Sequence, residues 1–146
     1  MIRKFHQEDA DAVVSIWREA TSIAHPFLPD DFVGSEAEAL RNIYLKFAKT
    51  WVYEADKELV GFIAMVENEV VGLFLRPAFH GQGIGRSMVD FAFETFGPLR
   101  VEVFEKNDIG RRFYHAYGFV GSDRYIHEAT RETVLKLACP VANPVA

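Results

Sequence analysis

The sequence predicts an α/β (α+β) protein with a mixed, mostly antiparallel sheet of about six to seven strands flanked by about four helices. Three observations support this fold class. Apolar residues recur at helical spacing in four segments, they alternate with other residues in the segments between, and tight polar turns separate three consecutive alternating segments. At 146 residues and 49% hydrophobic, the chain can close one core but not comfortably two. We therefore expect one domain over 1–139 and a frayed, proline-containing tail over 140–146.

The first third of the chain predicts a strand and two helices. Residues 1–5 have strand character, and 7–20 show helical spacing with acidic residues in the first turn, where the helix dipole favours them. Two prolines and a glycine interrupt 21–34, so we expect a loop with at most a fragment of helix there. Helical spacing returns over 36–49.

In the middle of the chain, the spacing of apolar residues changes to every second position. Segments 51–55, 59–66 and 70–75 predict three antiparallel strands joined by short polar turns. A glycine-rich turn follows, and a helix begins near Gly85 and continues through 87–96, where Gly-Pro stops it.

The last third predicts a strand at 100–104, a helix at 108–117 and two strands at 118–125 and 133–138. The strand, helix and strand across 70–104 form one βαβ unit. Because antiparallel strands precede that unit, a uniformly parallel doubly wound sheet is excluded.

Charge and cysteine content narrow the classes of partner. The net charge of −5, without a block of Lys or Arg, disfavours nucleic acid and favours a cationic small molecule or peptide. The one cysteine, Cys139, has no partner for a disulfide or a zinc motif, so we expect a reducing cytoplasm and no metal. No segment approaches ~18 uninterrupted apolar residues, so we expect no membrane insertion.

Three glycines alternate in the turn His80-Gly81-Gln82-Gly83-Ile84-Gly85 between a strand and a helix. Such a turn lets consecutive backbone N–H groups converge on an anion such as a diphosphate, in front of the positive end of the helix dipole. The alternative is that the three glycines simply allow a tight turn from the strand to the helix. A P-loop is excluded because Arg86 follows where Lys is needed, and the dinucleotide fingerprint lacks its third glycine.

Two segments resemble a known family. Residues 73–77 followed by 80–85 resemble the acetyl-CoA signature of the GNAT (Gcn5-related N-acetyltransferase) superfamily, and 107–119, read as N-x5-F-Y-x3-G-F, resembles its second signature. The resemblance covers nearly the whole chain and implies the GNAT fold. Residues 24–28 resemble the Thr-His-x-Phe-Leu segment of an uncharacterised bacterial subgroup. One departure is His80, where the family usually has Arg or Gln.

The resemblance implies an acetyl-CoA-dependent N-acetyltransferase that moves the acetyl group directly to a primary amine of a small molecule or peptide. It also implies an oxyanion held by a backbone N–H of the strand at 73–75. The residues expected to bind acetyl-CoA are Leu73, Phe74, Leu75, His80, Gly81, Gln82, Gly83, Ile84, Gly85, Arg86, Asn107, Gly110 and Phe113. A monomer or a homodimer is expected.

Candidate catalytic residues follow from the same resemblance. Tyr114 stands where the family places its general acid, although an aromatic residue on an apolar helical face also suits a core. Val71 occupies the position where many relatives carry a carboxylate base. Glu102, in a stretch similar to that of ribosomal-protein N-acetyltransferases, is therefore the first candidate base, and Glu69 is a weaker one. An outward polar position for Glu102, with a water chain or no side chain as base, stays open.

The acceptor and the competing functions complete the set of hypotheses. His25 and Phe27 are expected to contact the acceptor, because the resemblance implies that their segment lies over the acceptor cleft. A noncatalytic acyl-CoA-binding or sensing module is the alternative suggested by Val71 and His80. A dinucleotide-dependent oxidoreductase is a third hypothesis, weakened by the missing glycine.

Overall fold

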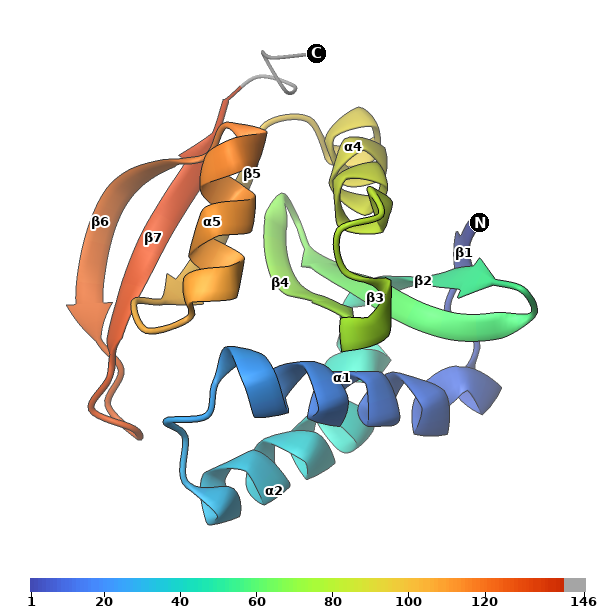
Figure 1. The fold of residues 1–146 in the computed structure, drawn as a ribbon, viewed down its shortest axis with the longest axis horizontal. Coiled ribbons are helices and arrows are strands. Elements are labelled where there is room, and N and C mark those ends of the chain that lie inside the picture. The colour runs from blue at the N-terminus through green and yellow to red at the C-terminus, as the bar shows by residue number, and fades with distance from the viewer. Residues whose placement is uncertain (141–146) are drawn as a thin grey trace.

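A computed structural model describes residues 1–140 of the chain. Seven strands form one sheet in the order β1-β2-β3-β4-β5-β7-β6 (Figure 1). The strands are β1 (Ile2–Lys4), β2 (Lys49–Ala55), β3 (Glu58–Val66), β4 (Glu69–Leu75), β5 (Leu99–Phe104), β6 (Val120–Ile126) and β7 (Thr133–Cys139). The helices are α1 (Ala10–Ala24), α2 (Asp30–Ala39), α3 (Leu45–Phe47), α4 (Ile84–Phe96) and α5 (Asp108–Tyr117), with a π-helical turn at Leu40–Tyr44 and 3-10 turns at Gln7–Asp9 and Pro77–Phe79.

This sheet confirms the predicted fold class. Every pair of neighbouring strands is antiparallel except β4 and β5, which run parallel and enclose α4 as the predicted βαβ unit. The predicted meander is β2-β3-β4, and the predicted helix at 108–117 has the bounds of α5. The proposed tail lies, beyond Pro140, outside the described residues.

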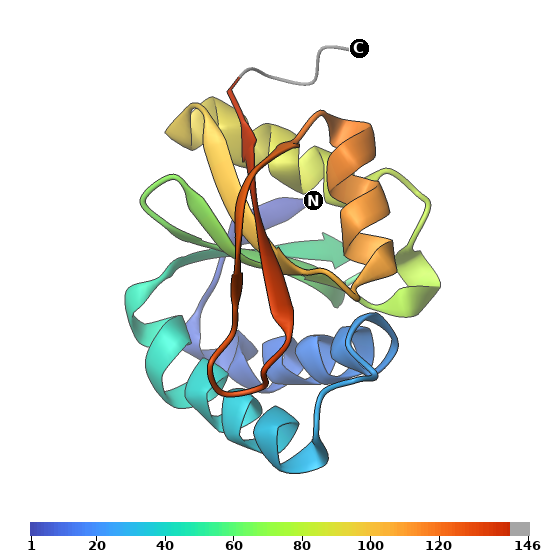
Figure 2. The ribbon, with the colours of Figure 1, turned by 90° about the vertical axis from the view of Figure 1, so that its left-hand side faces the viewer.

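Helices cover both faces of the sheet, as Figure 2 shows, with α1 and α2 on one face and α4 and α5 on the other. Adjacent residues of β3 point to opposite faces, so Phe62 packs with α1 and α2 while Ile63 packs with α4 and α5. Each face therefore has its own apolar cluster, and β3 and β4 lie between the two.

The loop expected at 21–34 is wrong. Helix α1 continues to Ala24, and α2 begins at Asp30, so the connection is short. The two prolines lie at its ends: Pro26 follows α1, and Pro29 is the N-cap of α2, where a missing N–H costs nothing. Buried Leu28 anchors the connection. Prolines that bound helices resemble loop prolines in a local reading of the sequence.

The second helical segment also differs from its prediction over 36–49. It begins earlier, at Asp30, and ends at Phe47, and its middle is the π-helical turn Leu40–Tyr44. An i→i+5 turn rotates the residues that follow by an extra part of a turn, and single π turns are frequent at functional sites. It sets the direction of Tyr44 and Phe47, which line the cleft described below.

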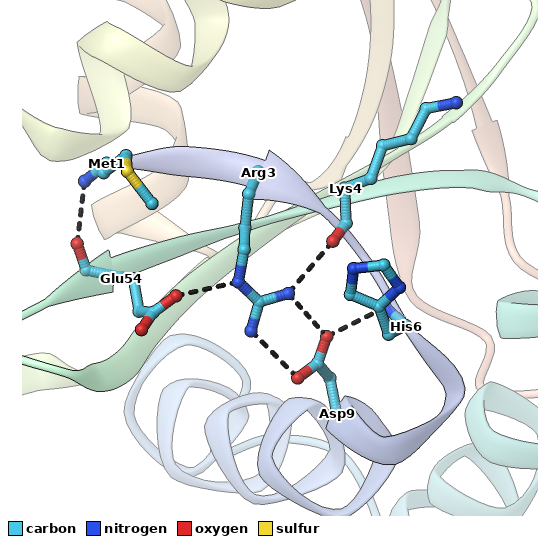
Figure 3. A network of polar contacts seen from close by, with 6 residues as sticks. All are labelled: Met1, Arg3, Lys4, His6, Asp9 and Glu54. Carbon is cyan, nitrogen blue, oxygen red and sulfur yellow. Dashed lines mark hydrogen bonds and ion pairs between the residues drawn. The ribbon is translucent and has the colours of Figure 1, made fainter.

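The N-terminus is tied to the sheet by an ionic network around Arg3 (Figure 3). The Arg3 guanidinium donates to both Asp9 carboxylate oxygens at 2.9 and 3.0 Å and to Glu54 at 2.7 Å. Asp9 also accepts from the His6 backbone N–H at 2.8 Å. Asp9 is buried, and the Arg3 hydrogen bonds lower the pKa of its carboxyl group. The network joins β1, β2 and the start of α1.

We expect Asp9→Asn to lower the free energy of unfolding by about 1–2 kcal/mol at pH 7, because Arg3 loses its two-oxygen acceptor. A carboxyl group whose pKa is lowered in the folded state stabilises the protein at pH values above its pKa in the unfolded state, ~3.9. This contribution disappears as the pH falls through the pKa of the folded state. The difference in the free energy of unfolding between variant and wild type, measured by urea titration, should therefore disappear at acidic pH. Asp11→Asn is the control, because its carboxylate is 91% exposed although paired with Arg41, so its loss should change little. A constant gap down to pH 2 would contradict the assignment.

Within residues 1–140, none of the helices combines the length and the apolar character that crossing a bilayer requires.

Candidate active site

The cleft of this protein opens where β4 and β5 separate. The two strands pair at Glu69–Arg100 and Val70–Val101 only, although both continue beyond these residues. A cavity of about 960 Å³ occupies the gap, and its walls come from α1, α2, the π-helical turn, β4, β5, the glycine turn and α5. It gives access to both faces of the sheet along one edge of β4.

Unpaired main-chain groups of β4 point into this gap. The Arg76 N–H donates to the Val60 carbonyl at 2.8 Å, so alternate residues of β4, Phe74 and Gly72, direct their amides toward β3. The amides of Leu73 and Leu75 therefore face the other way, toward the side that β5 has left. Val71 has no partner in the β3–β4 register and forms a bulge. Because of this bulge, the amides of alternate residues after Val71 point the opposite way from those before it, and Val70 still pairs with β5.

The glycine turn lies between β4 and α4, where the sequence predicted a strand-to-helix turn. Gly81 and Gly83 have φ values of 77° and 82°, which favour glycine, and Gly83 is the N-cap of α4. The positive end of the α4 dipole lies behind the turn. At Gly85 an added Cβ would lie 3.0 Å from the Phe113 ring, so this glycine allows α4 to approach α5 closely. The turn suits an anionic group such as a diphosphate.

A stacked cation lies beside this turn. Arg86 lines the cleft, and its guanidinium carbon lies 5.5 Å from the centroid of the Tyr117 ring. The Tyr117 hydroxyl donates to Asp90 at 2.6 Å, which holds the ring in place. Burial raises the pKa of Tyr117. The sequence reading missed Tyr117 and Asp90, because their contact joins two helices that are distant in sequence.

His80 is the first residue of the glycine turn. Its Nε2 lies 3.2 Å from the Leu75 carbonyl oxygen, on the edge of β4 that faces the gap. A neutral ring with Nε2 protonated would donate this bond. The side chain thus links the glycine turn to the end of β4.

Tyr114 lines the cleft from α5. The residue is buried, and its hydroxyl has no hydrogen-bond partner among the residues that the structure describes. Burial raises the pKa of Tyr114. The phenol is therefore protonated at neutral pH and free to donate to a molecule in the cleft.

Asn107 links the two sides of the cleft. Its Oδ1 accepts from the Gly110 N–H at 2.9 Å and caps α5, and its Nδ2 lies 3.2 Å from His25 Nε2. Since an amide nitrogen only donates, His25 Nε2 must accept, which places the ring proton on Nδ1. Burial lowers the pKa of His25 to about 4, so the ring is neutral at pH 7. An added Cβ at Gly110 would lie 2.5 Å from Asn107 Nδ2, so a larger residue here would displace the Asn107 side chain.

Glu102 also lines the cleft and is held by a tyrosine. The Tyr125 hydroxyl donates to Glu102 Oε1 at 2.5 Å, and this bond, with burial, raises the pKa of Tyr125 to about 12. Glu69 lines the cleft too, but it is paired with Arg100 at 3.2 Å. Of the two carboxylates, Glu102 is the one without a cation on it.

The structure brings most of the predicted site residues to one cavity. The predicted residues that line it are His25, Leu73, Phe74, Leu75, His80, Gly81, Gly83, Gly85, Arg86, Glu102, Asn107, Gly110, Phe113 and Tyr114. Three predicted residues do not line it. Ile84 is buried in α4, Gln82 is exposed, and Phe27 packs outside the cavity against His25 and Phe104.

Several cleft residues were missed by the sequence reading, among them Tyr44, Phe47, Tyr125 and His127. Tyr44 and Phe47 belong to a helix whose cleft-facing side carries no motif. Within residues 1–140, no group of three or more His, Cys, Asp or Glu side chains is arranged to hold a metal ion. Cys139 is buried and is not part of the cleft lining.

Comparison with known proteins agrees with this geometry. Residues 46–121 match the family model described as an acetyltransferase (GNAT) domain. The chain is 31% identical over 120 residues to the peptidyl-lysine N-acetyltransferase YiaC of Escherichia coli, covering 82% of each chain. It is 33% identical over 119 residues to the peptidyl-lysine N-acetyltransferase YjaB of Salmonella typhimurium, covering 81% of each.

Solved structures show the same fold. The solution structure of apo-form YjaB from Escherichia coli superposes with a TM-score of 0.87 at 27% identity, covering 97% of this chain and 98% of that one. The crystal structure of PaiA N-acetyltransferase from Thermoplasma acidophilum in complex with coenzyme A gives a TM-score of 0.75 at 22% identity, covering 93% and 96%. The second likeness concerns the fold alone. The chain belongs to the GNAT family of acetyltransferases, and it is an acyltransferase whose acyl donor is acetyl-CoA.

Proposed function

We propose that this acetyltransferase transfers the acetyl group directly to the side-chain amine of a lysine in a polypeptide, with Tyr114 as the general acid and Glu102 as the general base. The observation that carries the proposal is the protonated Tyr114 hydroxyl, without a protein partner among the described residues, in the cleft that the unpaired edge of β4 borders. The names of the relatives support the lysine acceptor.

The charge of the cleft supports a cationic acceptor. Among the described residues that line it, three are glutamates, Glu36, Glu69 and Glu102, and one is an arginine. The arginine, Arg86, lies beside the glycine turn, where anionic phosphates would lie. The glutamates belong to the helix α2 and to β4 and β5, so the cleft offers a carboxylate side for an ammonium group.

Acetyl-CoA supplies an activated thioester. Glu102 would take one proton from the incoming ammonium group and pass it to solvent, because only a neutral nitrogen has the lone pair that forms the new C–N bond. Glu102 would then accept the second proton, which the nitrogen loses once that bond has formed. The Leu73 and Leu75 amides would donate to the carbonyl oxygen as negative charge develops on it. Tyr114 would give its proton to sulfur as the C–S bond breaks, and solvent would return a proton to Tyr114.

Burial of Tyr114 is compatible with its role as an acid. A phenol with a raised pKa is a weak donor toward an ordinary thiolate, whose conjugate acid has a pKa near ~8.5. The same apolar cleft disfavours a thiolate, which raises the proton affinity of the departing sulfur as well. Because burial raises both proton affinities, the difference between the two groups is smaller than the raised pKa of the phenol alone would give.

We expect Glu102→Gln to lower kcat by about 10- to 100-fold and to flatten the rise of rate with pH on the acidic side, since the amide cannot accept the amine proton. The matched control is Glu69→Gln, which removes a cleft carboxylate already paired with Arg100. It should change kcat by less than about threefold. Equal losses in both variants would instead indicate a general effect of cleft charge.

A thiol-release assay tests the proposed function. Wild-type protein with acetyl-CoA is supplied with capped lysine peptides, with peptides whose one amine is the N-terminus, and with small amines. Transfer to the lysine peptides with the highest kcat/KM supports the proposal. Transfer to N-termini or to small amines alone would refute the lysine assignment while leaving the acetyltransferase assignment intact.

A further inference from the structure

An apolar wall borders the carboxylate side of the cleft, and the reaction proposed above does not use it. Tyr44 is 40% exposed, Phe47 is 58% exposed and Val71 is 46% exposed, and all three line the cleft. The Tyr44 and Phe47 ring centroids are 5.9 Å apart, in edge contact. We name Tyr44, Phe47 and Val71 the apolar wall. Large side chains left this exposed together along a cleft mark a contact surface.

The backbone places these side chains in the cleft. The π-helical turn ends at Tyr44, and Phe47, three residues later, lies on the same helical face. Val71 is the residue that the β3–β4 register skips, so the bulge re-aims its side chain. Two local departures from regular geometry therefore bring these side chains to the cleft lining.

A contact between α2 and the β6–β7 turn bounds one end of the cleft. Phe32, near the start of α2, contacts His127 with 5.9 Å between ring centroids, and Figure 2 shows the β6–β7 turn reaching α2. Phe47 lies fifteen positions further along the same helical run, or roughly 22 Å at 1.5 Å per residue. The Phe47 side of the apolar wall therefore lies far from the Phe32–His127 contact.

Charge lies next to this surface. Glu36 is close enough to Tyr44 to raise the pKa of that phenol together with burial, and Glu69 precedes Val71 by two residues. Glu36 and the apolar wall together favour an acceptor that has a positive charge and a neighbouring apolar side chain. A polyamine has the positive charge and leaves the wall exposed. A polypeptide segment has both.

We infer that the apolar wall is a docking surface for the acceptor polypeptide and selects lysines that have a large apolar residue next to them in sequence. The inference rests on the proposed lysine acetyltransferase function. It adds a preference among lysines, for which Phe47 is the main determinant because it is the most exposed member of the wall.

The test compares capped peptides that have one lysine each, flanked by Leu, by Gly or by Asp. Wild-type protein should acetylate the Leu peptide with a kcat/KM about tenfold above that of the Gly peptide, from the burial of one apolar side chain. The Asp peptide should be the poorest, because its negative charge would be repelled by Glu36.

Variants identify the surface. Phe47→Ala should bring the Leu-to-Gly ratio close to one, and Phe47→Leu should restore most of it. Ile43→Ala is the matched control, since Ile43 lies in the same helical run and is 54% exposed but does not line the cleft, so its ratio should stay at the wild-type value. Thermal melting of each variant checks that the fold is intact.

Equal kcat/KM for all three peptides in wild type, or a ratio that Phe47→Ala leaves unchanged, would overturn the inference and leave lysine acetylation standing. A small diamine that outcompetes every peptide would overturn it as well. If no lysine peptide is acetylated although CoA raises the melting temperature, the proposed function itself has failed.

Discussion

Replacing Tyr114 with Phe is expected to lower kcat by about 10²- to 10³-fold, because the variant has no proton to give to the departing sulfur. The KM for acetyl-CoA should change by less than about threefold, since the aromatic ring and its contacts with Phe113 and Phe119 remain. Steady-state thiol release over a range of acetyl-CoA concentrations measures both quantities.

Stability separates this effect from misfolding. Because the Tyr114 hydroxyl has no partner within residues 1–140, its removal breaks no hydrogen bond there, so the melting temperature should hardly change. The control is Tyr117→Phe, which removes a hydrogen bond to Asp90. Its main effect should be on the melting temperature and not on kcat. A Tyr114→Phe protein as active as wild type would remove Tyr114 from the mechanism.

The second large effect is expected in the glycine turn. In the double variant Gly81→Ala and Gly83→Ala, both residues would be held at positive φ, at a cost of about 1–2 kcal/mol each. The turn can relieve this strain only by rotating its peptide groups away from their shared direction. We therefore expect the Kd for CoA to rise by about 30-fold or more, measured by titration calorimetry.

Gly34→Ala is the matched control for the glycine turn. Gly34 lies inside α2, and an added Cβ would meet nothing within 4 Å. The change should leave the Kd for CoA unaltered and raise the free energy of unfolding by about 0.5–1 kcal/mol, because alanine favours the helix. Wild-type CoA affinity in the double variant would show that the main-chain amides of the turn do not bind the diphosphate.

The one long stretch that the sequence reading got wrong shows what local patterns can miss. Pro26, Pro29 and Gly34 together predict a loop, but the two prolines lie between α1 and α2 and Gly34 lies within α2. Buried Leu28 and the packing of α2 on α1 outweigh the low helix propensity of Gly34. Propensity is a weak prior where tertiary packing supplies most of the stability of a helix.

The candidate site also has some features that local sequence predicts and others that depend on long-range contacts. The glycine turn could be read directly, since glycines at alternate positions before a helix have a local backbone meaning that tertiary packing does not change. Asn107 as the cap of α5 is equally local, because it bonds Gly110 three residues later. The contact of Asn107 with His25 joins residues 82 positions apart, and no spacing rule predicts it.

The order of the helices and strands, the glycine turn and the family can be predicted from sequence, because periodicity, capping and glycine geometry act between residues a few positions apart. The place of the cleft, the bond from Tyr125 to Glu102, and the presence of Tyr44, Phe47 and Val71 in the cleft lining follow from the tertiary structure. These features depend on where β4 stops pairing with β5 and on a one-residue bulge, and strand register is set by long-range packing.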